Sequence, residues 1–199
     1  MMQSTTTAAS LIDEVIEGMG LFAPPPRAFF RNTMNECMTR LYTELVREAG
    51  VQTLAVAGAF LPFTSILSPT GVPVQREDIL AVYADGHQAR VLRSDLFDLT
   101  VSDKRNFFAL DDMGIMLAFP ARILRVRYLL RPPLCTAQNE DSYLIPLSPE
   151  FMPLLRARLL GEGYKAANED ALAAKWLSEY NQALDGFAAY LETRKGKEA

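Results

Sequence analysis

The stretch of sequence that decides the fold is FFALDDMGIMLAFPARILRVRYLLR, residues 107–131. Apolar runs at 107–110, 115–119 and 123–130 predict three short strands, because turn-forming residues at 111–114 and 120–121 separate them. Along the third strand the side chains alternate, so one face is apolar and the other is basic. The apolar face holds Leu124, Val126, Tyr128 and Leu130, and the basic face holds Arg125, Arg127 and Arg131 together with Ile123 and Leu129. We expect a small antiparallel meander here.

The three arginines allow two interpretations. They can form a solvated face whose aliphatic stems cover apolar surface. They can also pair with an acidic neighbouring subunit or with nucleic acid, because the guanidinium fork suits carboxylate and phosphate alike. The sequence leaves both interpretations open.

Strand signals also precede this stretch. Residues 51–57 predict a strand, and 79–84 and 87–92 predict a hairpin, because Asp85-Gly86 supplies the positive φ angles of a two-residue turn. The prolines at 62, 69 and 73 predict a loop between them that cannot hold a central sheet position. Three large apolar residues of this segment are hard to bury in one small domain, so we expect a partner to cover them. They are Phe60, Phe63 and Ile66.

Helical patterns flank the strands. We expect one helix over 11–19 that opens after Ser10 and ends at Gly20, and a second over 27–49 with Gly50 as its C-cap. A further helix begins after Ser148, and the glycines at 161 and 163 are expected to loosen its end. Asn168 is expected to cap a final helix that reaches Arg194. That helix carries an apolar stripe at helical spacing. Its members are Leu172, Trp176, Tyr180, Leu184, Phe187 and Leu191.

Together these elements predict an α+β fold, a helical bundle with a small antiparallel β-domain inserted between N-terminal and C-terminal helices. We expect one domain over residues 1–199, with N-terminal helices in 1–50, a β-rich insertion with loops in 51–133 and C-terminal helices in 148–195.

Composition excludes several classes of protein. The net charge of −4, from 20 basic and 24 acidic residues mixed along the chain, offers no basic footprint for duplex DNA. No apolar run approaches the ~20 residues of a membrane helix, and the N-terminus lacks the pattern of a secretory signal. We expect a soluble protein made in the cytoplasm, with no membrane partner. Cys37 lies between Met34 and Met38 on an apolar helical face, which favours a buried thiol over a disulfide.

Nothing in the sequence predicts an enzyme or a cofactor. The single histidine, His87, directly follows a turn glycine, and the chain has no phosphate-binding loop or nucleophile elbow. Asp111-Asp112 could bind a divalent cation, but adjacent carboxylates in a turn are more often turn formers. We expect no catalytic residues and no metal.

The order of these parts resembles the head-to-tail connector, or adaptor, proteins of tailed bacteriophages and gene transfer agents. The resemblance rests on the strand pair 107–119, on Arg125-Val126-Arg127-Tyr128 before Arg131-Pro132-Pro133, and on Ile145-Pro146-Leu147 before a helix. The terminal helix with Trp176, Glu179 and Tyr180 also fits, as do the N-terminal helices around Asn35 and Leu41-Tyr42.

The resemblance implies a non-catalytic virion protein of the neck that joins the portal of the capsid to the tail and acts in genome packaging and ejection. It implies a ring of about twelve copies, a closed head-to-tail assembly through whose lumen DNA passes. Its implied partners are the portal protein, tail or neck proteins and further copies of itself, with DNA open as another. The terminal helix would dock on the portal through Trp176, Tyr180, Phe187, Lys195 and Lys197.

Contacts with a neighbouring subunit or the tail would come from two sets of residues. The loop contributes Phe60, Phe63 and Ile66, while the basic face of Arg125, Arg127 and Arg131 would pair with an acidic patch at Glu140 and Asp141. Two other functions remain open, a tail-completion protein and a non-viral helical domain that dimerises or binds a partner.

Overall fold

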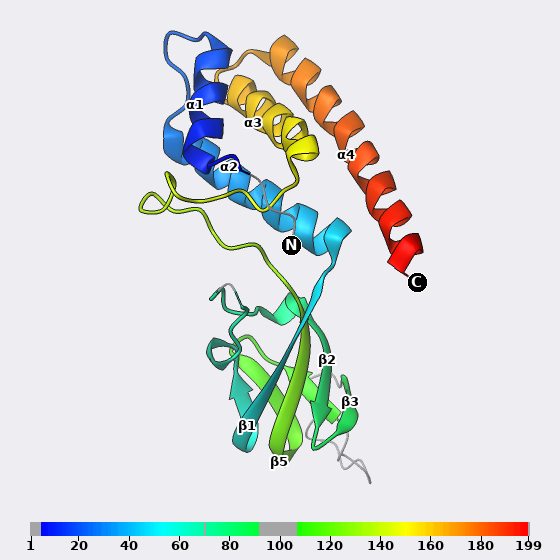
Figure 1. The fold of residues 1–199 in the computed structure, drawn as a ribbon. Coiled ribbons are helices and arrows are strands. Elements are labelled where there is room, and N and C mark those ends of the chain that lie inside the picture. Colours follow the sequence, from blue (N-terminus) through cyan, green and yellow to red (C-terminus); the bar gives the residue numbers. More distant parts are fainter. Residues whose placement is uncertain (1–4, 70, 92–106, 199) are drawn as a thin grey trace. The chain divides into compact units, whose positions relative to one another are not determined.

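The chain forms two compact units, which this computed structural model describes over residues 5–69, 71–91 and 107–198. The helical unit contains the chain up to Val46 and again from Leu134 onward. The barrel unit is Arg47–Pro133 and contains the strands of the described residues (Figure 1). The helical unit is therefore assembled from both ends of the chain.

Four α-helices make up most of the helical unit. They are α1 (Ala8–Met19), α2 (Arg27–Arg40), α3 (Met152–Ala166) and α4 (Asp170–Glu198). Helix α1 begins earlier than predicted, because the side chain of Thr7 accepts a hydrogen bond from the backbone N–H of Ser10. It ends at Gly20 as expected, in a left-handed conformation with φ of 60°. No helix that the structure describes is both long and apolar enough to cross a membrane.

The predicted helix over 27–49 is wrong at its end. Helix α2 continues as a π-helical turn, Leu41–Val46, and strand β1 begins at Ala49. Gly50 is a strand residue opposite Tyr128 and not a C-cap. A Cβ at Gly50 would lie 2.8 Å from side-chain atoms of Tyr128 and Leu130, so glycine is required here by packing.

The junction between α3 and α4 also differs from the prediction. Asn168 has φ of 61°, and the N–H of Glu169 bonds to the carbonyl of Tyr164 at 2.9 Å. This left-handed residue with its 6→1 hydrogen bond is a Schellman motif, so Asn168 ends α3 and does not cap α4. Gly161 and Gly163 do not loosen the helix, because Leu177 packs against Gly161 and Phe30 against Gly163.

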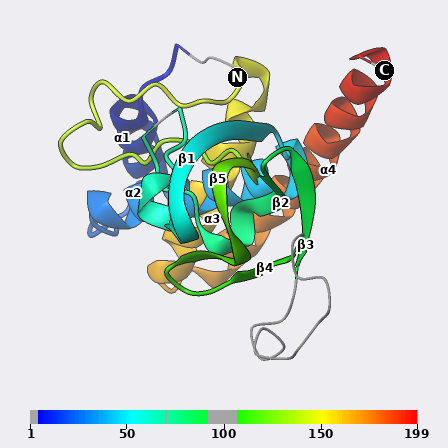
Figure 2. The same cartoon turned by 90° about the horizontal axis from the view of Figure 1, so that it is seen from below.

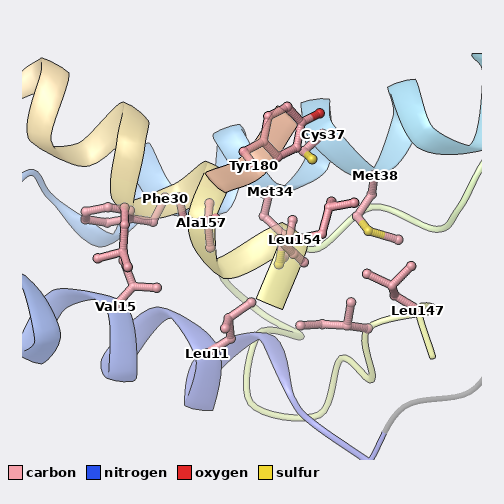
Figure 3. Packing of buried hydrophobic residues seen from close by; sticks show 14 of the residues in the cluster. Leu11, Val15, Phe30, Met34, Cys37, Met38, Leu147, Leu154, Ala157 and Tyr180 are labelled. Carbon is pink, nitrogen blue, oxygen red and sulfur yellow. The ribbon is translucent and has the colours of Figure 1, made fainter. Parts of the chain in front are cut away.

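One apolar core holds the helical unit together. Figure 3 shows side chains from α1, α2, α3 and α4 meeting there with Leu147, which comes from the segment before α3. Phe30, Met34 and Leu154 are almost completely buried. Cys37 and Cys135 are both free and buried, which confirms the prediction for Cys37.

The barrel unit is built from five strands that pair into one sheet. They are β1 (Ala49–Pro62), β2 (Ile79–Ala84), β3 (His87–Val91), β4 (Phe107–Leu110) and β5 (Gly114–Leu129). Their order is β1-β5-β2-β3-β4, and β4 pairs again with β5. The first half of β5 pairs with β4 and the second half with β2, so the sheet closes into a barrel (Figure 2).

This closed barrel contradicts the predicted fold class of a helical bundle with a small antiparallel insertion. The sheet is not wholly antiparallel, because β3 and β4 run parallel, with Arg90 opposite Phe107. Of the predicted meander, the first pair is confirmed, since β4 and β5 pair antiparallel. The predicted turn at Pro120-Ala121 is absent, since β5 runs through it. The register with β1 shifts around Gly58, opposite Ala121, so the two strands bend there and accommodate a residue without an N–H.

Two local predictions have opposite outcomes. The hairpin is confirmed, with Asp85 and Gly86 at φ of 46° and 87° between β2 and β3. The prediction of an exposed loop is wrong for two of its three apolar residues. Phe63 and Ile66 lie in the core of the barrel unit, and Ile66 is 0% exposed. Phe60 lies in β1 and is 45% exposed.

Candidate interaction surfaces

The residues expected to dock on the portal lie on different sides of α4. Tyr180 and Phe187 face the core of the helical unit and are buried, so they anchor α4 to the other helices. Trp176 is half-buried, and the ammonium nitrogen of Lys175 lies 5.2 Å from its ring centroid. The side chains of Lys195 and Lys197 lie outside the described part of the structure.

One side of α4 presents apolar side chains to solvent. Leu172, Trp176, Ala183 and Tyr190 share this side at helical spacing, and we name it the apolar flank. Leu172 and Tyr190 are among the exposed large hydrophobic residues of the molecule. The Tyr190 ring contacts Phe151, with centroids 4.9 Å apart, so the C-terminal part of this flank is packed onto the start of α3. The apolar flank therefore combines exposed side chains with others, such as Trp176 and Ala183, that pack partly against the core of the helical unit.

The polar groups beneath α4 are chemically inert. Burial raises the pKa of the Cys37 thiol to about 11, although Tyr180 donates a hydrogen bond that lowers it. Burial also raises the pKa of Tyr180 to about 12. Both groups are therefore neutral at physiological pH, and Cys37 lacks the thiolate that reactivity needs.

Glu140 is occupied inside the helical unit and is not an open acidic patch. Its side chain is 6% exposed and forms ion pairs with Arg27 at 2.6 Å and Arg31 at 2.7 Å. Burial alone would raise the pKa of this carboxyl, but the hydrogen bonds from Arg31 and Arg27 outweigh it and hold the pKa below its ordinary value. Arg27 also pairs with Asp13 of α1. Only Asp141 of the predicted pair is exposed.

Arg131 is likewise occupied within its own unit. Its Nε donates to both carboxylate oxygens of Asp78, at 2.9 and 2.8 Å, and an Nη donates to Glu77 at 3.0 Å. Asp78 is 1% exposed and also accepts from the N–H of Gln75. Arg131 is therefore occupied by carboxylates of its own unit.

Arg125 and Arg127 do lie on an exposed face of the barrel. Arg125 is opposite Thr53 on β1 and Tyr83 on β2, and its guanidinium carbon lies 5.9 Å from the Tyr83 ring centroid. Arg127 is opposite Val51 and Ala81. Within the described ranges, no carboxylate forms an ion pair with either arginine. We name the outward side chains of β1, β5 and β2 around this pair the arginine face.

The remaining candidates are turn and surface residues. Asp111 accepts from the N–H of Met113, and Asp112 pairs with Arg76 at 3.1 Å, so both stabilise the β4–β5 turn region. Among the described residues, no three potential metal ligands cluster. His87 is exposed at the start of β3.

Strand alternation alone places Ile123 on the side of the arginines, but sequence reasoning missed that Val51 of β1 lies beside them. Val51 and Ile123 are 49% and 50% exposed beside Arg127 and Arg125. The alternation along each strand was the available signal, because Ile123 and Val51 share the phase of the arginines once the β1–β5 register is known.

The chain matches a known protein family. The family model described as SU10 adaptor protein matches residues 6–196, which includes both units. No curated protein matches the chain. Since the family match covers nearly the whole chain, the protein belongs to the SU10 adaptor protein family and is a structural adaptor of a bacteriophage virion.

Proposed function

We propose that this protein joins the portal of the capsid to the tail, as a subunit of a ring of about twelve copies through which DNA passes. The observation that carries the proposal is the family match over residues 6–196, because an adaptor is by definition placed between two other components. The protein would enter the virion neck from the host cytoplasm during assembly and perform no catalysis.

The apolar flank of α4 is the proposed portal contact. Tryptophan and tyrosine are enriched among residues that dominate binding energy at interfaces. Leu172, Trp176 and Tyr190 offer such side chains beside the stripe through which α4 packs into the core of the helical unit. Tyr180 and Phe187 contribute by fixing the position of this helix, and the terminal lysines extend the contact.

The test is binding of the full chain to the portal protein of the same genome, followed by mass photometry and electron microscopy. We expect a ring of copies on the portal. Leu172→Glu should weaken binding at least 10-fold without unfolding the protein, because this exposed side chain contributes little to the core. Trp176→Ala should weaken it similarly.

Gln182→Ala is the matched control, since Gln182 is exposed on another side of α4. Equal binding by Leu172→Glu, Trp176→Ala and the control would refute the flank assignment. If the chain did not bind the portal but bound the end of a tail tube, it would be a tail-completion protein. A stable dimer that binds neither would favour a helical dimerisation domain.

A further inference from the structure

The two units carry different charge. The residues of the helical unit include ten basic and fifteen acidic side chains, a formal charge of −5. The barrel unit has ten basic and nine acidic side chains, a formal charge of +1. The acidity of the chain, net −4 overall, therefore resides entirely in the helical unit.

The arginine face is open because its neighbours are small and uncharged. The outward positions of β1 beside the two arginines are Val51, Thr53 and Ala55, and all are exposed. On β2 the positions beside them are Ala81 and Tyr83. Arg125 and Arg127 are about 7 Å apart along the strand, so their two guanidinium groups lie on the same surface, among mostly short side chains.

The complementary surface lies on α4, on the side turned away from the apolar flank. Asp170, Asn181 and Asp185 share this side at helical spacing, and Glu192 continues it. Small residues, Ala174 and Ser178, occupy the positions between them, and no lysine or arginine lies on this side from Asp170 to Asp185. We name it the acidic flank. Asp185 and Glu192 are about 10 Å apart along the axis, within reach of two arginines.

We propose that the arginine face of one copy binds the acidic flank of α4 in a second copy. This inference rests on the proposed ring, and it assigns the contact between neighbours. Each chain carries both surfaces, so the contact is head-to-tail and can repeat around a closed ring. It also leaves the apolar flank of α4 free for the portal.

The composition of the arginine face favours a protein partner over nucleic acid. Arginine and tyrosine beside exposed aliphatic side chains, without lysine, are typical of the centre of protein interfaces. The described part of the barrel unit contains no lysine, and Val51 and Ile123 add apolar surface that a phosphate backbone would leave unused. The second copy supplies both carboxylates and small side chains.

A charge swap in the full chain tests the contact. Arg125→Glu with Arg127→Glu should weaken association between copies about 100-fold, because each reversal places like charges opposite one another. Asp185→Arg with Glu192→Arg should do the same. A chain with all four changes should associate again, since every neighbour then presents the reversed pair. Arg90→Glu, an exposed change on β3, is the control and should have no effect.

Crosslinking makes the assay independent of portal binding. Thr53→Cys on the arginine face and Asn181→Cys on the acidic flank should form crosslinks between chains, both on the portal and in concentrated protein alone. The unmodified chain, with its two buried cysteines, is the background. Failure to bind the portal would count against the proposed function and leave this readout intact.

Three outcomes would overturn the inference. They are crosslinks within single chains only, association unaffected by the arginine reversals, and no rescue by the fourfold swap. If Arg125→Glu with Arg127→Glu abolished binding to a duplex DNA probe but left association between copies unchanged, the arginine face would be a nucleic-acid site instead.

Discussion

The helical unit and the barrel unit each contain one buried carboxylate held by arginine, but the two clamps differ. Glu140 is shared by two arginines of α2, and Arg27 and Asp13 remain half-exposed. Asp78 is more deeply buried and receives two hydrogen bonds from a single Arg131, which is itself largely covered. The helical clamp therefore joins two arginines to one carboxylate, whereas the barrel clamp joins two carboxylates, Asp78 and Glu77, to one arginine.

Breaking the barrel clamp should have the largest effect. Asp78→Ala leaves Arg131 buried without its main partner and should destabilise the barrel unit by about 3–4 kcal/mol. Urea denaturation followed by circular dichroism should show the barrel unfolding at lower urea, separately from the helices. Asp112→Ala, which removes an exposed pair with Arg76, is the control and should change little. Equal effects of the two changes would show that burial of Asp78 is not what matters.

Breaking the helical clamp should cost less. Glu140→Ala should destabilise the helical unit by about 2 kcal/mol, because Arg31 loses its carboxylate while Arg27, which is 41% exposed, keeps Asp13 as a partner. Thermal unfolding measures the difference. The adjacent, exposed Asp141→Ala serves as the control. A loss as large as that of Asp78→Ala would remove the contrast between the two clamps.

Alanine substitutions at two glycines, one in each unit, should change the stability of the protein in opposite directions. Gly50→Ala in β1 should destabilise by about 1–3 kcal/mol, because its Cβ would overlap Tyr128. Gly186→Ala in α4 should stabilise by up to about 1 kcal/mol, since nothing lies within 4 Å of a Cβ there. Chemical denaturation of both variants provides the measurement, and stabilisation by Gly50→Ala would contradict the packing at Tyr128.

Acid titration should give the smallest effect. The pKa of Glu140 is lower in the folded protein than its ordinary value, so the unfolded chain binds the proton more readily. The stabilisation is therefore present above the ordinary pKa and is lost as pH falls through the folded value. Stability measured from pH 6 down to about pH 3 should fall less steeply for Glu140→Gln than for the natural chain. Parallel curves would contradict this linkage.

The same contrast explains what the sequence could predict. Helix starts and ends depend on nearby residues, so the end of α1 at Gly20 and the Asp85-Gly86 hairpin followed from local chemistry. The barrel depends on pairings distant in sequence, such as Gly50 with Tyr128 and Arg90 with Phe107. No local pattern specifies these pairings, so β5 was divided at Pro120 and Gly50 was assigned to a helix.

The candidate surfaces show the same limit. Periodicity located the apolar stripe of α4, but not which of its members face solvent, because that depends on where α3 packs. Strand alternation placed Arg125 and Arg127 on an outward face, whereas the partners of Arg131 and Glu140 come from residues 53 and more positions away. The residues of such long-range ion pairs have no characteristic spacing in the sequence, so periodicity cannot identify them.

The division of the helical unit between the two ends of the chain has a consequence during synthesis. Helices α1 and α2 leave the ribosome before α3 and α4, and Arg47–Pro133 must be translated before α3 exists. At about 5–20 residues per second, the chain from the end of α2 to the end of α3 takes roughly 6–25 s to translate, and during this time the apolar side of α2 lacks its packing partners α3 and α4. Nascent chains of this protein are thus exposed to chaperones at Phe30, Met34 and Met38, residues that the finished subunit hides completely.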